Sequence, residues 1–438
     1  MLDKLNQLPF FYLIRHKSFQ NFIFLFLIQS SNVLISLISM PILIQSIGLE
    51  QFGLVNLAFS VVLLFNVLVG FGYNLSGPRE IALQQENKRE MGAVFSKILC
   101  SKLLLASISL GLIVLMGSAG GFFEEYRTIL FWSAILLLSE ATTTTWFFQG
   151  LEKMKLASLA NVFSKLMYLF LLVLFIQQPD HSKWANFFLG FTGFVSNFLL
   201  ILYIHHYLVV RFRFPGLAKI WQSWKENLML FLSGLASHVA VNGGLIILSF
   251  FAAAQVLGLY SLAERIGMVL RIVPTLITQA AYPNASKLFV QNNRRFYLFL
   301  RKVQLSSTAL CFLITFGIYV GAPQIIYLMS GDRLASSVIF LRILAFLPLF
   351  ASLNISNMLI ILVTNQKKIL FDSTWTFCLY MIISAVLMTH FFGGEGLAFA
   401  LLSTELFIFI VSALLLRTKS PFVLKKFYGT LFGSLRHT

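Results

Sequence analysis

The residues best placed to do chemistry are charged side chains inside an apolar stretch at 255–283. Glu264, Arg265 and Arg271 interrupt a run that is otherwise long and apolar enough to cross a bilayer. The residues that share one helical face with Glu264, at spacings of three and four, are Met268, Arg271, Thr275 and Thr278. A charge in mid-membrane costs about 2.5–3.5 kcal/mol on insertion scales, so such residues face protein or trapped water. This stripe of polar residues on one helical face predicts either a transport path or a charge pair that ties two helices together.

Further ionisable and polar side chains interrupt the other apolar runs. Arginine forms paired hydrogen bonds to phosphate, so several buried cations predict a phosphate-bearing or acidic ligand. The candidates for binding its head group are Arg271, Arg265, Lys165, Lys102, His238, Asn242, Gln29 and Asn32. The candidates for ion coupling or for static charge balance are Glu140, Glu264 and Glu405, and the sequence leaves both roles open. Small polar side chains and a lone histidine are also typical of helix packing.

Composition indicates the class of protein that holds these residues. Of 438 residues, 58% are hydrophobic and 11% are charged, and long apolar runs recur from residue 22 to residue 416. This pattern predicts an all-α polytopic membrane protein without a separate soluble domain. The three cysteines lie far apart in apolar stretches, so we expect them to pack in the core and expect no metal site.

The apolar runs predict twelve transmembrane helices. Their ranges are 20–46, 53–74, 92–117, 127–149, 155–176, 184–208, 228–252, 256–280, 303–329, 336–362, 372–392 and 396–416. Lysines and arginines gather at both chain ends and in every second connection, whereas the other connections hold only Arg333 beyond the helix ends. The positive-inside rule therefore predicts that both termini are cytoplasmic. The net charge of +17 indicates topology and contact with anionic lipid, and we expect no nucleic-acid partner.

The two halves of the chain repeat at an offset of 205 residues. The shift lays F-G-L-V-N-L-A at 52–58 on L-G-L-Y-S-L-A at 257–263, and Pro78 on Pro283. Both segments come second in a six-helix half, so the repeat is parallel and predicts two pseudo-symmetric six-helix lobes around a central cavity. The expected ranges are an N-terminal lobe at 1–210, a basic cytoplasmic linker at 211–227, and a C-terminal lobe with a basic tail at 228–438.

Several motifs carry a resemblance to a known family. The most specific is W-F-F-Q-G-L-E-K-M-K at 146–155. It is joined by G-L-E-Q-F-G at 48–53, V-L-G-L-Y-S-L-A-E-R-I at 256–266 and the A-Y-P that ends at Pro283. With these motifs the chain resembles, over nearly its whole length, the multidrug/oligosaccharidyl-lipid/polysaccharide exporter superfamily. The likeness is strongest to its polysaccharide branch, the Wzx-type O-antigen flippases.

That resemblance implies a function as well as a fold. Two six-helix lobes would enclose a cavity that opens alternately to each side of the inner (cytoplasmic) membrane. The implied substrate is undecaprenyl pyrophosphate carrying a short oligosaccharide of the O-antigen type, moved from the inner to the outer leaflet. Members of the family are described with a cationic lumen, which Arg271, Arg265 and Lys165 would match. The implied partners are membrane lipids, an O-antigen polymerase and a chain-length regulator.

The sequence also indicates which energy source drives transport and which other functions are disfavoured. No G-x-x-x-x-G-K-[ST] loop occurs, so we expect no ATP hydrolysis and no cofactor, and a proton or cation gradient would drive transport through Glu140 or Glu264. A lipid II flippase and a cation-coupled multidrug exporter are alternatives with the same expected fold, although the buried cations count against the exporter. A glycosyltransferase or polymerase would need a sizeable catalytic loop. The short connections therefore favour a secondary transporter over an enzyme.

Overall fold

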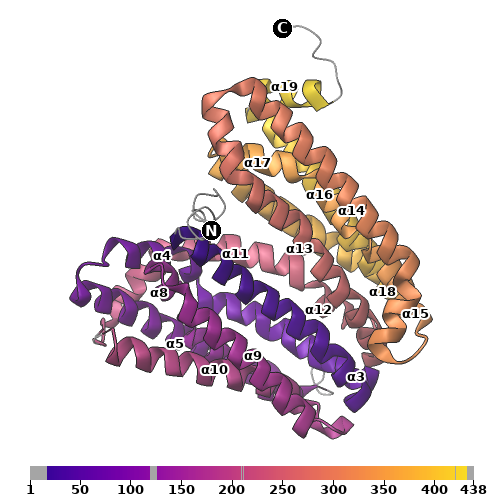
Figure 1. The fold of residues 1–438 in the computed structure, drawn as a ribbon. Coiled ribbons are helices and arrows are strands. Elements are labelled where there is room, and N and C mark those ends of the chain that lie inside the picture. The colour runs from indigo at the N-terminus through magenta and orange to yellow at the C-terminus, as the bar shows by residue number, and fades with distance from the viewer. Residues whose placement is uncertain (1–16, 119–125, 209, 211, 420, 432–438) are drawn as a thin grey trace, which may run out of the picture. The chain divides into compact units, whose positions relative to one another are not determined.

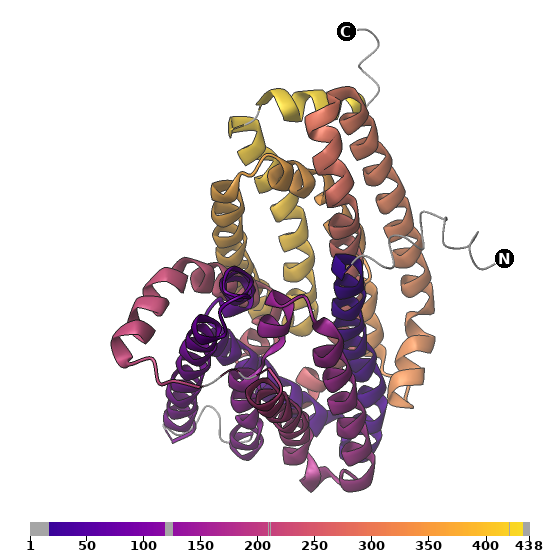
Figure 2. The ribbon, with the colours of Figure 1, turned by 60° about the vertical axis from the view of Figure 1, so that its left-hand side comes forward.

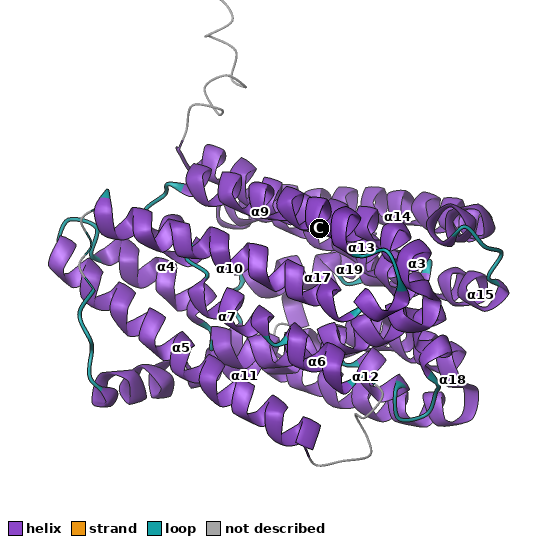
Figure 3. Ribbon diagram, turned by 90° about the horizontal axis from the view of Figure 1, so that it is seen from below, coloured by secondary structure: helices purple, strands orange, loops and turns teal. Residues whose placement is uncertain are grey.

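The structure is a computed structural model that describes residues 17–118, 126–208, 210, 212–419 and 421–431. Within these ranges every element is a helix and no strand occurs (Figures 1 and 3). The predicted all-α class is therefore confirmed for the part of the chain that is described. The two chain ends, which the positive-inside rule places in the cytoplasm, lie outside these ranges.

The chain forms two compact units, residues 1–235 (unit 1) and 236–438 (unit 2). Unit 1 contains α3 (Lys17–Gly70), α4 (Tyr73–Leu83), α5 (Lys88–Ser118), α6 (Arg127–Ser133), α7 (Ile135–Thr142), α8 (Thr145–Gly150), α9 (Met154–Phe175), η1 (Pro179–His181) and α10 (Lys183–His206). Unit 2 contains α12 (Gly244–Leu248), α13 (Ala254–Gln291), α14 (Asn293–Ser330), α15 (Ala335–Leu344), α16 (Leu347–Leu353), α17 (Ile355–Val363), α18 (Lys367–Lys419) and α19 (Pro421–Leu431). The division falls inside α11 (Leu217–Asn242).

The stretch predicted to be a linker, 211–227, is partly helical. It is helical from Leu217 onward, as the start of α11. Two of its side chains bond to unit 1: the Ser223 hydroxyl lies 2.9 Å from the Tyr73 hydroxyl, and the Trp224 indole N–H donates to Ser101. Because Tyr73 and Ser101 are buried, these bonds attach one face of the stretch to the core of unit 1, while most of its other described residues are exposed.

Seven helical stretches in the described chain are long and apolar enough to cross a membrane, so the protein is a multi-pass membrane protein. They are Ile23–Leu83, Lys88–Ser118, Met154–Phe175, Pro179–His206, Arg294–Ser330, Ala335–Val363 and Lys368–Thr418. The helix α3, whose 54 residues would extend about 80 Å, is interrupted at Gly48, where φ is 78°. Gly393 interrupts α18 in the same way, with φ of 57°. Both glycines lie in predicted short loops, and a left-handed backbone there favours glycine.

Two predicted spans are divided into three helices each, at corresponding places in the two units. In unit 1 the span at 127–149 becomes α6, α7 and α8; in unit 2 the span at 336–362 becomes α15, α16 and α17. Each break frees carbonyl groups that cannot bond to water inside a membrane. Donors from neighbouring helices bind them: Asn197 donates to the Ser139 carbonyl at 3.0 Å, and Gln304 donates to the Ser352 carbonyl at 3.0 Å.

The backbone also forms the same type of turn at the C-terminal ends of α8 and α17. The N–H of Lys153 donates to the Phe148 carbonyl, and the N–H of Gln366 donates to the Ile361 carbonyl, five residues back in both cases. This is the Schellman arrangement of a helix end. Its left-handed position is held by Glu152 (φ 56°) in unit 1 and by Asn365 (φ 53°) in unit 2. The repeat detected in the sequence therefore has a local counterpart in backbone geometry.

The core of each unit lies among its own helices. In unit 1, aromatic side chains from α8 pack with residues of α4, α5 and α9, and Trp146, Phe147 and Phe148 are all buried. In unit 2, α13 and α14 lie side by side over much of their length (Figures 1 and 2), and their buried residues join those of α17 and α19.

Candidate functional site

One embedded charge pair lies in unit 1 between α5 and α7. The Lys102 ammonium is 3.1 Å from Oε1 of Glu140. The lysine side chain is fully buried, whereas the glutamate side chain keeps 24% of its exposure. Gly70 of α3 lies close to the same carboxylate oxygen, 3.5 Å from where its Cβ would be. The structure thus joins two predicted site residues as a salt bridge, in which Lys102 is already neutralised by protein.

A second cation of unit 1, Lys165 of α9, has different surroundings. It is half-buried and, in the described part of the chain, forms no salt bridge with a carboxylate. One turn earlier on the same helix, the side-chain amide oxygen of Asn161 (Oδ1) accepts a hydrogen bond from the Ser31 hydroxyl of α3 at 3.1 Å. Asn32, the next residue of α3, is exposed. Amide, hydroxyl and ammonium groups therefore gather where α3 and α9 pack, in a form that can receive an anion.

Unit 2 contains one salt bridge among the described residues. The guanidinium of Arg271 on α13 lies 2.6 Å from Oε1 of Glu405 on α18. The side chain of Arg271 keeps 18% of its exposure and that of Glu405 keeps 8%. The sequence named both residues without pairing them, because their separation of more than 130 positions carries no periodic signal. A planar guanidinium has five N–H donors, so Arg271 can hold Glu405 and still donate to a ligand.

The other charged residues of α13 are Glu264 and Arg265. Both are half-buried. Glu264 forms no salt bridge in the described part of the chain, and its Oε1 lies close to Gly244 at the start of α12, 3.7 Å from where a Cβ would be. The stripe predicted from the sequence stays accessible over part of its length, since Thr275 is exposed, while Thr278 is buried and donates to the Pro274 carbonyl.

The uncharged candidates lie on α11 and α3. His238 is exposed, and its Nδ1 is 3.3 Å from the side-chain amide nitrogen of Asn242, one turn further along α11. Gln29 and Asn32 are exposed on α3. The structure therefore pairs His238 with Asn242 on one helix, and it places Gln29 and Asn32 on α3 and Lys165 on the neighbouring helix α9.

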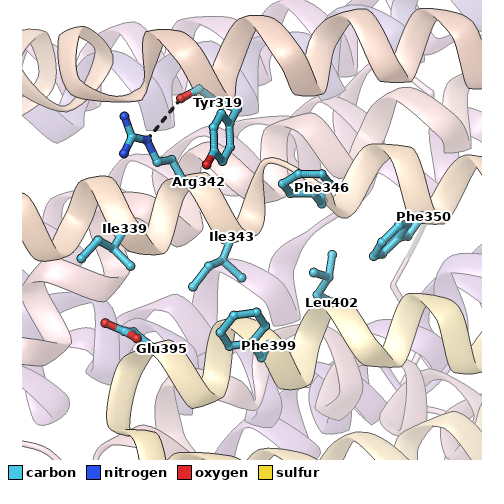
Figure 4. Close-up of a pocket in the computed structure, with 9 residues that line it drawn as sticks. All are labelled: Tyr319, Ile339, Arg342, Ile343, Phe346, Phe350, Glu395, Phe399 and Leu402. Atoms are coloured by element: carbon cyan, nitrogen blue, oxygen red, sulfur yellow. Dashed lines mark hydrogen bonds between the residues drawn. The ribbon is translucent and has the colours of Figure 1, made fainter.

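A cavity of about 490 Å³ lies between α14, α15 and α18 (Figure 4), and no pattern in the sequence predicts it. Arg342 and Glu395 border it, together with aromatic and aliphatic side chains. The sequence predicts that Arg342 lies inside the helix at 336–362 and that Glu395 lies in a short loop. No spacing links the three segments, and only their packing places them around one cavity.

The most specific sequence motif has a packing role. Gly150 must be a glycine, because a Cβ there would lie 2.7 Å from both the Pro78 carbonyl oxygen and Cβ of Ile81. The Gln85 side chain donates to the Gly150 carbonyl at 2.6 Å, which joins α8 to the end of α4. The motif at 146–155 thus positions helices of unit 1.

An all-helical, multi-pass chain with half-buried cations in its membrane-spanning helices has the features of a membrane transporter. Residues 18–289 match the family described as "Polysaccharide biosynthesis protein", which is more than half of the chain. The chain therefore belongs to that family, in the polysaccharide-transporter branch of the multidrug/oligosaccharidyl-lipid/polysaccharide exporter superfamily.

Curated relatives and solved structures agree with this assignment. A protein of Escherichia coli K12 named "Putative O-antigen transporter" is 26% identical over 390 residues, covering 88% of this chain and 93% of the relative. A Shigella dysenteriae protein of the same name is 28% identical over 401 residues, covering 89% and 97%. An inward-facing multidrug resistance MATE transporter has a TM-score of 0.69 at 17% identity, covering 90% of this chain and 96% of that one. The lipid II flippase MurJ has a TM-score of 0.67 at 15% identity, covering 94% and 91%. Both structures show the fold.

Proposed function

We propose that this membrane transporter moves undecaprenyl pyrophosphate carrying an O-antigen-type oligosaccharide from the inner to the outer leaflet of the cytoplasmic membrane. Twelve helices in two pseudo-symmetric lobes would open a central cavity alternately to each side. The pyrophosphate-sugar head group would be sheltered in protein while the prenyl tail stays in lipid. The relatives named as O-antigen transporters, which match the chain over nearly nine-tenths of its length, support the substrate class.

The single observation that carries the head-group assignment is the environment of Lys165. A half-buried ammonium in a membrane-spanning helix, with no salt bridge in the described chain, has positive charge that no protein carboxylate offsets. The Ser31–Asn161 pair one turn away supplies neutral hydrogen-bonding groups of the kind that bind sugar hydroxyls and phosphate oxygens. Arg271, with donors left beyond Glu405, would add a second contact to the head group.

Coupling to a proton or cation gradient is assigned to Glu264. Of the three embedded carboxylates proposed from the sequence, Glu140 is paired with Lys102 and Glu405 with Arg271. Glu264 lacks such a salt bridge in the described chain, so protonation or cation binding there would not first break one. We expect Glu264→Gln to slow turnover more than it weakens substrate binding. Flipping that is insensitive to an imposed pH or sodium gradient would contradict this role.

The proposal is tested by complementation. The gene is expressed in a bacterial strain that lacks its own O-antigen transporter but makes the lipid-linked repeat unit that the source organism's sugar genes specify. We expect the lipopolysaccharide ladder to return on gels, and surface antigen to be labelled in intact cells. Intracellular accumulation of the lipid-linked unit despite normal membrane abundance of the protein would contradict the proposal.

Two parallel strains separate the competing transport functions. If the protein rescues depletion of the lipid II flippase but not O-antigen display, the substrate is a cell-wall precursor. If it lowers accumulation of a cationic dye such as ethidium and does not restore antigen, it is a multidrug exporter. We expect no dye export, because the embedded charge of unit 1 is positive. We expect no rescue of the lipid II flippase, because the curated relatives are named as O-antigen transporters.

A further inference from the structure

A continuous groove on unit 2 is formed by two neighbouring cavities. The smaller, of about 490 Å³, lies between α14, α15, α16 and α18 and is lined mainly by apolar and aromatic side chains, among them Phe346, Phe350 and Phe399 (Figure 4). The larger, of about 800 Å³, lies between α14 and the start of α15. Ile339 and Arg342 border both cavities. These volumes are in the range of small-molecule sites.

The polar groups of this groove are concentrated at one end. Arg333 and Arg342 both line the larger cavity. The Nε of Arg342 donates to the Tyr319 carbonyl at 3.4 Å, and its guanidinium lies 5.3 Å from the centre of the Tyr319 ring. Neither arginine forms a salt bridge within the described residues. The backbone contact fixes the Arg342 guanidinium while leaving its terminal N–H groups for a ligand.

Glu395 borders the smaller cavity from the α18 side (Figure 4). It too forms no salt bridge in the described residues, so its negative charge remains at the groove. Two arginines and one glutamate leave a net charge of +1. That balance suits a group with a single negative charge better than one with two or three.

The residues around the groove have the exposure and the residue types that are typical of a membrane-spanning helix near the membrane surface. Leu328 is 72% exposed, and Tyr327, Ile339 and Phe399 are exposed as well. Tyrosines are enriched where acyl chains meet head groups. Arg333 belongs to the connection between α14 and α15, which the sequence predicts to lie on the outer face, and Arg342 follows about two turns into α15.

We propose that this groove binds a bilayer glycerophospholipid of the outer leaflet. Its phosphodiester, which carries one negative charge, is held between Arg342 and Arg333, and one acyl chain lies along Phe346, Phe350 and Phe399. Arginine matches phosphate geometry with paired N–H donors, and basic pockets between membrane helices bind phospholipid head groups. Glu395 disfavours a pyrophosphate, so the groove is distinct from the site proposed for the transported substrate.

The purified full-length protein in detergent, titrated with dioleoyl phosphatidylglycerol and followed by native mass spectrometry, tests the site. We expect Arg342→Gln to weaken binding of the lipid about fivefold to tenfold, as for loss of one charge-assisted hydrogen bond at a half-buried position. Arg294→Gln, which removes an exposed arginine near the other end of α14, is the matched control and should leave binding unchanged. Equal losses in both variants would overturn the proposal, since they would indicate unspecific attraction.

Ligand competition identifies what the groove holds. Dioleoylglycerol, which lacks the phosphate, should not compete, and inorganic phosphate should not compete at millimolar concentration. Effective competition by either would overturn the assignment to a phospholipid. Undecaprenyl pyrophosphate that competes better than phosphatidylglycerol would assign the groove to the transported substrate and would equally overturn it.

A second variant, which keeps both arginines, tests the site even if Arg342→Gln fails to fold. Leu402→Trp adds volume inside the smaller cavity. We expect it to reduce labelling of peptides from α15, α16 and α18 by a phosphatidylglycerol whose acyl chain carries a photoreactive diazirine. Unchanged labelling in this variant, with the elution profile of the parent protein, would contradict the placement of the acyl chain.

Discussion

Unit 1 has an excess of positive charge among its embedded residues. Lys102 and Glu140 neutralise one another within 3.1 Å, in a pair whose lysine is fully buried. Lys165, on a different helix, has no such partner among the described residues and remains half-buried. The sequence names both lysines as candidate head-group ligands. The structure distinguishes them, because only Lys165 has positive charge still available to an anion.

In unit 2, the embedded charges of α13 are in balance. Arg271 pairs with Glu405, while Glu264 and Arg265 are adjacent and of opposite sign. This difference from unit 1 indicates that the two units have different roles in the proposed mechanism. Unit 1 would supply the fixed positive charge that holds a pyrophosphate, and unit 2 would supply charges that exchange partners during transport.

The largest effect is expected from breaking the buried pair of unit 1. Lys102→Met leaves Glu140 without its partner, which should cost about 3 kcal/mol of unfolding free energy, the low end for buried pairs because Glu140 is partly exposed. The double variant Lys102→Met with Glu140→Leu should recover to within about 1 kcal/mol of the parent, since no charge is then left unpaired. Denaturant or thermal unfolding in detergent measures both. A double variant that folds like the parent but exports no antigen would show that the pair takes part in transport.

The corresponding pair of unit 2 should behave differently. Arg271→Ala should abolish surface antigen while the protein remains in the membrane, with a stability loss of about 2 kcal/mol because the pair is partly solvated. Adding Glu405→Gln should restore the stability but not the export, because the donors for the head group are still missing. Immunoblots of membranes and lipopolysaccharide gels give the two readouts. Export restored by the double variant would mean that Arg271 acts only as a structural partner.

A smaller effect is expected in the packing that supports unit 1. Gly150→Ala places a methyl group against the Pro78 carbonyl and Ile81, and should cost about 1–3 kcal/mol. Gly111→Ala on α5 is the matched control, because a methyl group there meets no atom within 4 Å. It should be neutral, or stabilising by up to about 1 kcal/mol, in thermal unfolding. Equal melting temperatures for the two variants would contradict the close approach of α8 to α4.

The smallest effect is expected at the two Schellman turns, where a glycine variant of each turn can be compared. Glu152→Gly should raise stability by about 1 kcal/mol, because a left-handed backbone is unfavourable for glutamate. Asn365→Gly should gain only a few tenths, about 0.3 kcal/mol, because asparagine tolerates that conformation. Thermal unfolding of the two variants under identical conditions gives the difference. If Glu152→Gly destabilises the protein, the two turns are not equivalent.

Much of the fold could be predicted from the sequence, because apolar length and charge placement in a membrane protein reflect the bilayer. The helix bounds of α9 and α10 fall within two residues of the predicted spans. The breaks inside the spans at 127–149 and 336–362 could not be predicted. They depend on Asn197 and Gln304, whose side chains reach the freed carbonyls from other helices.

The candidate site was predictable as a set of residues but not as a set of pairs. Periodicity placed Glu264 and Arg271 on one face of α13, which the helix reproduces. Whether a charge is neutralised depends on a partner far away in the sequence, as with Glu405 for Arg271. Sequence alone could therefore not separate Lys165 from Lys102.

The central claim is that Lys165 holds the anionic head group, and direct binding tests it best. The purified protein, reconstituted in nanodiscs, is titrated with undecaprenyl pyrophosphate carrying the repeat unit. Lys165→Gln should weaken binding about tenfold or more, as expected for a lost charge-assisted contact to phosphate. Lys155→Gln, an exposed lysine on the same helix, should bind like the parent. Parental affinity in Lys165→Gln, with the fold intact, would contradict the account.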